Sequence, residues 1–461
     1  MKRLVCLVLA TALLGPTGCA NRAKRSVALY ESGDYAGALR AADEGLASHP
    51  GDNGLWSMKV RSALALGDAD AITKAYASYV ASRGENDKEL LRDLATATIA
   101  QALASPSAKL EIAAIEAVES LEIHALADQV ALRMESSDDR VVAAAAVAVL
   151  RGFPEAPKVA EAMLESDNAE ARRIVLEGIA KKYKKLAVGD LEDAAKSDRD
   201  PRVRRAAVRW LGQIKDKDAV EILMKRAKDP DDSVRAAAVI ALGQIGIGNL
   251  PAIAKQALAD RSLAVRLAGV DVLRDARQDA ELVALIDDKD PMVALTAAMY
   301  AKSAPPELKR KAVERALGAE EWTMRAGTAN LLVPTVGKET ARTYAQKLVA
   351  DPDVRVRLAG ARVLAYSGDV IAAKPIFSAA LSDSDAGIQA AGELATLGDP
   401  TGIDALSAAV RDMSKTPEQR IAAVAAHRNA HRVTPGLVGA LADASALVRI
   451  EAATTIGALA K

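Results

Sequence analysis

Histidine and cysteine are the side chains most used for proton transfer, nucleophilic attack and metal binding near neutral pH, and this sequence holds few of them. Its four histidines lie at positions 49, 124, 427 and 431. His427 and His431 are four residues apart, so they would share one face of a helix. A zinc site needs three or four ligands, however, and no third strong ligand follows at a motif spacing. We therefore expect two surface or half-buried histidines and no metal.

Other motifs of catalysis are equally scarce. Residues 246–251 (GIGNLP) have the outline of a dinucleotide-binding loop, but they follow an expected helix instead of a strand, and Pro251 takes the place of the last glycine. The sequence has no Gly-x-Ser-x-Gly nucleophile motif and no Walker loop. We expect no cofactor, no small-molecule substrate and no enzyme activity. Asp and Glu are abundant, so a site made of two carboxylates that come together only on folding remains an alternative.

The two cysteines lie close to the start of the chain. A basic start (MKR) precedes an apolar run over 4–14 that is too short to span a bilayer, which is typical of a secretory signal peptide. The run leads into residues 15–19 (GPTGC), which resemble the lipobox of bacterial lipoproteins, although Pro16 stands where these proteins usually have leucine. The resemblance implies a signal peptide over 1–18 and a lipid on Cys19.

The lipoprotein interpretation also predicts a location. Cys6 would leave with the signal peptide, so Cys19 would be the one thiol in the exported chain, and lipidation explains it. Residues 19–22 would form the lipidated tether. The signal that retains lipoproteins in the inner membrane is an Asp directly after the lipidated cysteine, and this sequence has Ala20 there. By this resemblance, we expect the protein in the outer membrane, with its folded part in the periplasm. Cleavage after Ala20, giving a soluble periplasmic protein, is the alternative. No later segment has about 18 consecutive apolar residues, so we expect membrane contact through the lipid only.

Composition narrows the class of protein further. The 461 residues carry 61 basic and 61 acidic side chains, a formal net charge of zero, which argues against nucleic-acid binding through bulk charge. Half of the residues are hydrophobic but only 3% are aromatic, so small and aliphatic side chains must fill the core. One hydrophobic core does not grow to this length. The chain is therefore either several domains or a repeat array.

Helical hairpins are expected over residues 23–100. Small and aromatic residues from Gly33 to Pro50 fall at the spacing of a tetratricopeptide (TPR) repeat, in which small residues let paired helices approach and proline ends the second helix. Trp56 opens a second unit, with Gly67 at its turn. The segment is similar to TPR repeats in part of their pattern, and two such units need a neighbour to cover their last face.

A longer repeat of about 31 residues occupies 107–461. An arginine recurs with steps of 28 to 32 residues, and eight of the twelve positions in its column are Arg. The column comprises Glu111, Val142, Arg172, Arg204, Arg235, Arg266, Ala294, Arg325, Arg357, Gln389, Arg420 and Arg449. Apolar residues in each unit follow a helical period, with no sustained alternation of the strand type. The sequence therefore predicts an all-α fold, a right-handed α-solenoid.

Each repeat has the same expected parts. A first helix, helix A, leads through a short turn to helix B, which starts at an Asp N-cap followed by Pro. The pairs Asp200-Pro201, Asp290-Pro291 and Asp351-Pro352 fit this start. Gly212 and Gly243 near the end of helix B offer a flexible exit.

This pattern resembles the HEAT family, including the short repeats of phycobilisome lyase-like proteins, most strongly over 195–275. The resemblance implies a ladder in which the Asp of each turn pairs with the Arg of helix B between neighbouring repeats. The residues that match it are Asp200, Arg204, Asp231, Arg235, Arg266, Asp353 and Arg357. Some HEAT-like enzymes bind iron through His-Glu pairs, and this sequence has no His followed by Glu.

Solenoids usually hold another macromolecule on a long surface. We expect a scaffold or assembly factor with a protein or peptide partner, and the alternative is an enzyme or enzyme subunit that acts on envelope polymers. The positions one and five residues after each arginine of the column define a candidate partner surface. The middle of this surface is more apolar than a face exposed to solvent requires. Its residues are Arg205, Arg209, Ile240, Leu267, Asp271, Leu295, Met299, Asn330, Leu358 and Arg362. The competing interpretation is that the leucines pack against the neighbouring helix B.

Overall fold

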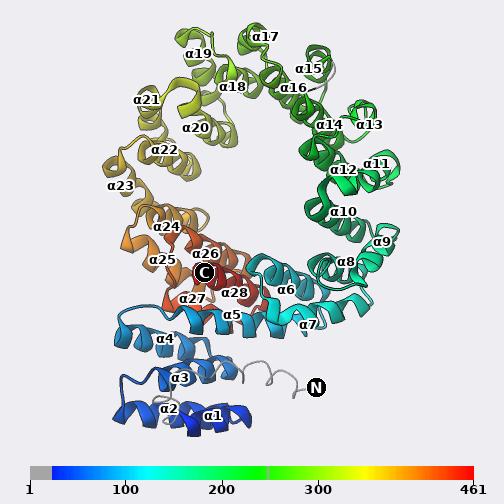
Figure 1. Cartoon of the computed structure of the whole chain (residues 1–461). Coiled ribbons are helices and arrows are strands. Elements are labelled where there is room, and N and C mark those ends of the chain that lie inside the picture. Colours follow the sequence, from blue (N-terminus) through cyan, green and yellow to red (C-terminus); the bar gives the residue numbers. More distant parts are fainter. Residues whose placement is uncertain (1–22, 247–248) are drawn as a thin grey trace. The chain divides into compact units, whose positions relative to one another are not determined.

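The computed structural model describes residues 23–246 and 249–461, and every regular element within them is a helix (Figure 1). The expected all-α class is thereby confirmed. Cys19, the signal peptide and the tether lie outside the described residues. In the part described, no helix is both long enough and apolar enough to cross a membrane.

The chain divides into two compact units. Unit 1 comprises Met1–Arg133 and Phe377–Lys461, and unit 2 comprises Met134–Ile376. Unit 1 therefore contains both the expected hairpins over 23–100 and the last repeats of the 31-residue series. The division does not follow the change of repeat type in the sequence, because the C-terminal repeats fold together with the N-terminal helices.

Unit 2 is an α-solenoid of stacked hairpins with two helix layers. The B layer, on the concave side of unit 2 in Figure 1, comprises α8 (Asp139–Ala148), α10 (Ala169–Tyr183), α12 (Pro201–Ile214), α14 (Asp232–Ile245), α16 (Leu263–Asp275), α18 (Pro291–Tyr300), α20 (Trp322–Val336) and α22 (Val354–Tyr366). The A layer comprises α9 (Ala156–Leu164), α11 (Val188–Ser197), α13 (Val220–Arg226), α15 (Leu250–Leu258), α17 (Asp279–Ala284), α19 (Pro306–Leu317) and α21 (Lys338–Leu348). Each B helix packs on the next B helix, so the B layer is continuous.

Aspartate caps start most of the B helices, as expected. Asp200 accepts the backbone N–H of Arg202 at 2.8 Å, with Pro201 as the first residue of α12. Asp290 caps α18 in the same way. The third expected cap, Asp351, is wrong: α22 starts two residues later and its cap is Asp353, because Pro352 belongs to the preceding turn. Proline is therefore a guide to the turn and not always to the first helical residue.

Small residues bring the B helices together. A Cβ atom on Gly212 in α12 would lie 2.6 Å from Cβ of Ala241 in α14. Gly212 thus allows close packing of two helices, whereas the sequence suggested a flexible exit there. The exit from α12 is Lys215 and that from α14 is Gly246, each in the left-handed region. Close helix contact through Gly and Ala explains how a core with few aromatic residues is filled.

Unit 1 combines helices from both ends of the sequence. Its N-terminal elements are α1 (Lys24–Glu31), α2 (Tyr35–Ser48), α3 (Asn53–Leu66), α4 (Ala69–Arg83), α5 (Lys88–Leu103), α6 (Ala108–Leu121) and α7 (Ala127–Ala131). Its C-terminal elements are α24 (Gly387–Thr396), α25 (Pro400–Arg411), α26 (Pro417–Ala430), α27 (Pro435–Gly439) and α28 (Ala446–Leu459). Helix α23 (Val370–Ala380) crosses the boundary between the units.

The last helices pack directly on the first ones. Helix α28 lies against α5 and α6, and α27 lies against α4 (Figure 1). A Cβ on Gly439 would lie 2.0 Å from Oγ1 of Thr73, so only glycine fits at this contact. Lys461 donates to the carbonyl of Ser120 at 3.2 Å, and Arg411 pairs with Asp70 at 3.1 Å. Unit 1 is therefore held together by contacts between helices that are far apart in the sequence, in addition to the contacts between successive helices.

An aromatic cluster in the N-terminal hairpins orients the start of α5. Trp56 on α3 and Tyr79 on α4 are stacked with ring centroids 6.0 Å apart. The Tyr79 hydroxyl donates to Asp87 at 2.6 Å, and Asp87 caps α5. Burial is the main reason why the pKa of Tyr79 is raised, so the phenol stays a donor. This cluster fixes the helix on which α28 packs.

Candidate functional site

The structure contains a ladder of arginine–aspartate pairs between successive repeats. Each arginine lies on a B helix of unit 2 or, for Arg420, on α26 of unit 1, and reaches an aspartate in the turn before the next helix of that layer. The shortest nitrogen–oxygen distance in each pair is 2.7 to 2.9 Å. These rungs are Arg172–Asp198, Arg204–Asp229, Arg235–Asp260, Arg325–Asp351 and Arg420–Asp443. In each of them both Nε and Nη2 of the arginine donate to one carboxylate, a bidentate geometry.

The acceptors differ from those expected from the sequence. Asp200, Asp231 and Asp353 are helix caps, and none of them accepts the ladder arginine. The rungs use the aspartate two residues earlier, whose carboxylate also accepts the backbone N–H of the cap residue; in one turn, Asp231 donates to Asp229 at 3.0 Å. The first aspartate thus joins two repeats and the second starts the helix.

Arginine also braces its own turn. Nη1 of Arg235 donates to the carbonyls of Asp229 and Pro230, six and five residues before it. Arg357 makes the same two contacts with Asp351 and Pro352. Arg266 departs from the pattern, because it reaches the cap aspartate Asp290 at 2.6 Å in the repeat that the sequence shows to be shortened.

Because the arginine–aspartate pairs are buried, their role is to hold successive repeats together. The side chains of Arg420 and Asp443 are each 4% exposed. At Asp229, burial alone would raise the pKa, but hydrogen bonds from Arg204 and the Asp231 N–H outweigh it and hold the pKa below its usual value. Removing one partner of such a buried pair typically costs about 3–5 kcal/mol, because the other charge stays buried and unpaired.

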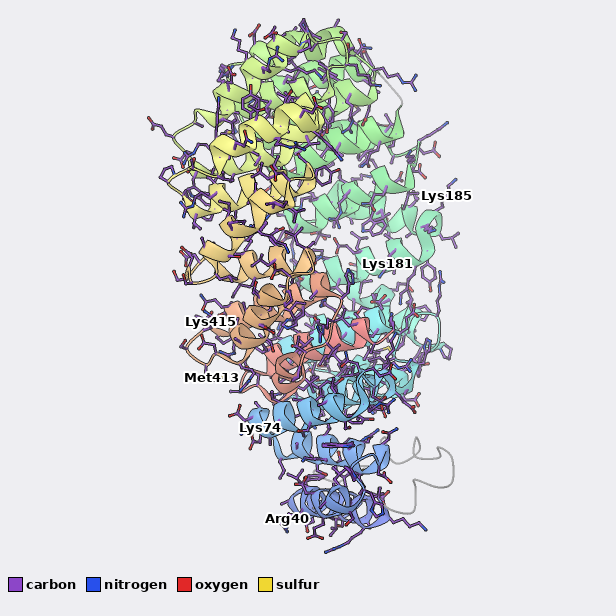
Figure 2. The ribbon with its side chains drawn as sticks, turned by 90° about the vertical axis from the view of Figure 1, so that its left-hand side faces the viewer. Arg40, Lys74, Lys181, Lys185, Met413 and Lys415 are labelled. Atoms are coloured by element: carbon purple, nitrogen blue, oxygen red, sulfur yellow. The ribbon has the colours of Figure 1, made fainter. Side chains whose placement is uncertain are left out.

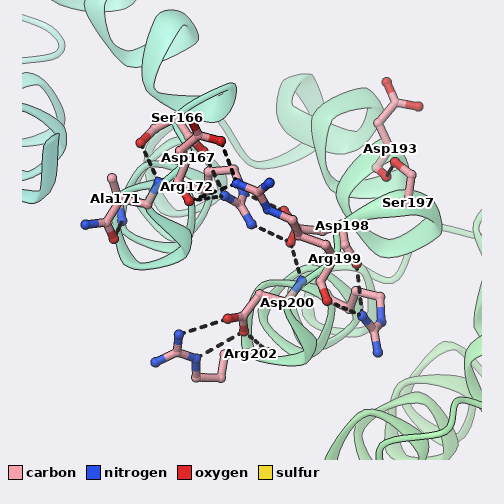
Figure 3. Close-up of polar contacts among 12 residues, drawn as sticks. Ser166, Asp167, Ala171, Arg172, Asp193, Ser197, Asp198, Arg199, Asp200 and Arg202 are labelled. Carbon is pink, nitrogen blue, oxygen red and sulfur yellow. Dashed lines mark hydrogen bonds and ion pairs between the residues drawn. The ribbon is translucent and has the colours of Figure 1, made fainter.

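A close-up of one rung shows how the turns connect at the edge of unit 2 (Figure 3). Arg172 binds Asp198, while the neighbouring Arg199 pairs with Asp167 at 2.8 Å. Arg202 donates to Asp200 and lowers its pKa to about 2. The polar groups in Figure 3 thus form a chain of ion pairs that joins turn to turn.

A cavity of about 390 Å³ adjoins this rung. Asp190 and Asp193 line part of it, and burial together with the charges of Asp193 and Glu161 raises the pKa of Asp190. Among the described residues, no group of three or more His, Cys, Asp or Glu side chains is placed to hold a metal ion. Arg172, which also lines the cavity, is bound to Asp198.

The candidate partner surface is only partly exposed. Leu295 and Leu358 are fully buried, and Leu267 and Met299 are half-buried. The expected apolar stripe is therefore wrong as an open groove, because these positions are covered within the B layer, where each helix packs on the next. This agrees with the competing interpretation that the leucines are part of the core.

The other positions of that surface remain accessible to different degrees. Ile240 is 37% exposed and Arg205 and Asn330 are exposed. Arg209 is exposed and pairs with Glu177 at 2.8 Å. Asp271 is half-buried and bound to Arg274, and Arg362 is half-buried as well. The B layer therefore offers a mixed polar surface with one exposed isoleucine near its middle.

His427 is more buried than expected. Its side chain is fully buried on α26; Nδ1 lies 2.9 Å from the carbonyl of Ala423 and Nε2 lies 3.1 Å from Oγ1 of Thr434. Burial lowers its pKa. His431 is exposed and ends α26 in the left-handed region, so the two histidines do not converge on one ligand. Thr434 caps α27, which connects His427 to the helix that lies on α4.

The geometry defines an α-solenoid whose hairpins are joined by buried ion pairs. The family model for HEAT repeats matches residues 156–243 and 188–273, so HEAT repeats are present in unit 2. The comparison with curated proteins gave no match.

Several solved structures are similar to the chain. The complex of CpcE and CpcF of phycocyanin lyase from Nostoc sp. PCC7120 has 17% identity, covers 61% of this chain and 96% of its own, and has a TM-score of 0.29. Kap121p has 15% identity, and the match covers 77% of this chain and 48% of the Kap121p chain with a TM-score of 0.33. Importin beta has 14% identity, and the match covers 93% of this chain and 61% of the importin beta chain with a TM-score of 0.30.

Proposed function

We propose that the protein is a periplasm-facing outer-membrane lipoprotein that acts as a protein-interaction scaffold. The observation that supports the scaffold role is the continuous B layer of HEAT-type hairpins, whose successive repeats are joined by the buried arginine–aspartate ladder. A surface held this rigidly can bind a partner without first becoming ordered, which lowers the entropic cost of binding.

The partner surface of this proposal is the exposed part of the B layer. Arg205 on α12, Ile240 on α14 and Asn330 on α20 are exposed there, and so is Arg209 on α12, which pairs with Glu177. A single isoleucine among charged and amide groups suits a protein surface with a small apolar contact and polar surroundings. The partner is therefore expected to be a folded or extended protein segment of mixed polarity.

Partner capture tests the scaffold role. Crosslinking in cells followed by detergent extraction should recover the chain with a reproducible protein partner. Recovery of the chain alone, together with turnover of cell-wall material by the purified protein, would support an enzyme and reject the scaffold.

The anchor rests on Cys19 and the residues before it. A cell fed a fatty-acid analogue should label the wild-type chain, and Cys19→Ser should abolish the label and release the protein from the membrane fraction. An unlabelled wild-type chain, or a Cys19→Ser variant that fractionates with the membrane as the wild type does, would reject the anchor in favour of cleavage after Ala20.

A further inference from the structure

Four lysines and an exposed leucine form one turn of unit 2. Residues 181–186 (KKYKKL), here called the lysine turn, comprise the end of α10 and the start of a short 3-10 helix over Lys184–Ala187. The turn has no acidic residue, and the Leu186 side chain is 86% exposed. Lys185 lies at the right-hand edge of unit 2 in Figure 2, and Lys181 lies lower and further in.

The base of the lysine turn is fixed to the preceding B helix. Nζ of Lys182 donates to the carbonyls of Val147 and Ala148 at the end of α8. Arg151 donates in turn to the carbonyl of Lys182. The tip is different: within the described residues, the side chains of Lys184 and Lys185 are exposed and make no hydrogen bond or ion pair. A fixed base therefore presents two unpaired cations beside an exposed leucine.

The backbone at the tip is strained. Lys184 has φ 51° and ψ −114°, a combination that residues with a Cβ rarely adopt. Such strain is concentrated at functional sites. The equivalent turn after α12 is relaxed, since Lys215 has φ 58° and ψ 44°, an ordinary left-handed cap.

The dipole of helix α10 explains only two of the four lysines in the lysine turn. Lys181 and Lys182 lie in the last turn of α10, where cations are favoured by the helix dipole. Lys184 and Lys185 lie beyond the helix end. In the equivalent turn after α12, Asp216 and Asp218 alternate with the lysines and balance them.

We propose that the lysine turn binds the anionic headgroups of a phospholipid surface, with Leu186 inserted among the acyl chains. Leu186 stands out from the protein instead of lining a groove, and a bilayer interface accepts a protruding apolar side chain without shape complementarity. Lys184 and Lys185 then lie at headgroup level, where lysine binds phosphate while its stem contacts the apolar region. This is a second membrane contact in addition to the proposed lipid on Cys19.

The test places a reporter at the inserting position. The full chain carrying Leu186→Trp is mixed with vesicles of brominated phosphatidylglycerol or brominated phosphatidylcholine, and its fluorescence is compared with that of the wild type, which supplies the signal of Trp56, Trp210 and Trp322. The added tryptophan should shift to shorter wavelength and be quenched by the anionic vesicles only. Inorganic phosphate should leave it unchanged, which separates a lipid surface from the free anion.

Matched double variants test the lysines. Lys184→Gln with Lys185→Gln in the Leu186→Trp chain should weaken partition into anionic vesicles by about thirtyfold, as expected for two lysines near a charged surface. Lys215→Gln with Lys217→Gln, in the equivalent turn of the next repeat, should leave it unchanged. No quenching by anionic vesicles, quenching equal in both lipids, or equal loss in the two double variants would overturn the proposal. The readout is local to residue 186, so it does not depend on acylation of Cys19.

Discussion

Gly457 on α28 lies so close to Leu121 at the end of α6 that a Cβ on the glycine would be 2.6 Å from Cδ1 of the leucine. The contact joins the final helix of the chain to one of its first helices within unit 1. The exposed face that a terminal repeat of a solenoid would leave is covered here by the N-terminal helices.

Gly457→Leu tests this contact. The added side chain cannot fit against Leu121, and overpacking of this kind typically costs about 1–3 kcal/mol. The free energy of unfolding, measured in urea, should fall by that amount. Gly327→Leu on α20 is the control, because a Cβ at Gly327 would meet no atom within 4 Å. Equal losses in the two variants would contradict the packing described here.

The sequence could predict the repeats but not this contact. A helical period shows which face of a hairpin is apolar, as with the face of α12 that carries Val203, Ala207 and Leu211. It does not show which distant segment will cover the last such face. Gly439 and Gly457 look like ordinary small residues until their partners Thr73 and Leu121 are known.

Arg420→Met should be among the most damaging changes on a B helix. It leaves Asp443 buried without its partner, and the expected loss in the free energy of unfolding is about 3–5 kcal/mol. The double variant Arg420→Met, Asp443→Leu should recover part of the loss, since no unpaired charge remains.

Arg428→Met is the matched control for that rung. Arg428 joins α26 to α28 through Glu451 at 2.8 Å, whereas Arg420 joins α26 to the turn before α28. The Arg428 side chain is 46% exposed, so its loss should cost less than about 1 kcal/mol. A similar cost for the exposed and the buried pair would show that burial does not determine the strength of the ladder.

The ladder also shows where sequence reasoning was sound and where it stopped. The arginine column identified the donors Arg204 and Arg235 correctly. The acceptors were misplaced by two residues: Arg204 binds Asp229 and not Asp231, because both are acidic residues in one turn and the sequence does not show which of them faces the neighbouring repeat. Spacing of the form Asp-x-Asp or Asp-x-Ser before α12, α14 and α28 was the available signal, since the first aspartate serves the rung and the second residue starts the helix.

His427 should make stability depend on pH. Its pKa is lowered by burial in the folded chain, whereas in the unfolded chain it is near 6.5, so the unfolded state binds the proton first as pH falls. Its contribution to stability is complete above about pH 7 and is lost progressively below 6.5. His427→Gln should remove this dependence between pH 8 and pH 5. His431→Gln, at an exposed position, should keep the wild-type slope, and an unchanged slope in His427→Gln would refute the assignment.

The most direct test of the proposed scaffold compares two side chains of equal exposure on opposite layers of unit 2. Ile240 on α14 in the B layer is 37% exposed, and Met224 on α13 in the A layer is 38% exposed. Ile240→Glu and Met224→Glu should both leave the melting temperature close to that of the wild type. Ile240→Glu should abolish capture of the crosslinked partner, and Met224→Glu should preserve it. Full capture by Ile240→Glu, or loss of capture by Met224→Glu alone, would contradict the B layer as the partner surface.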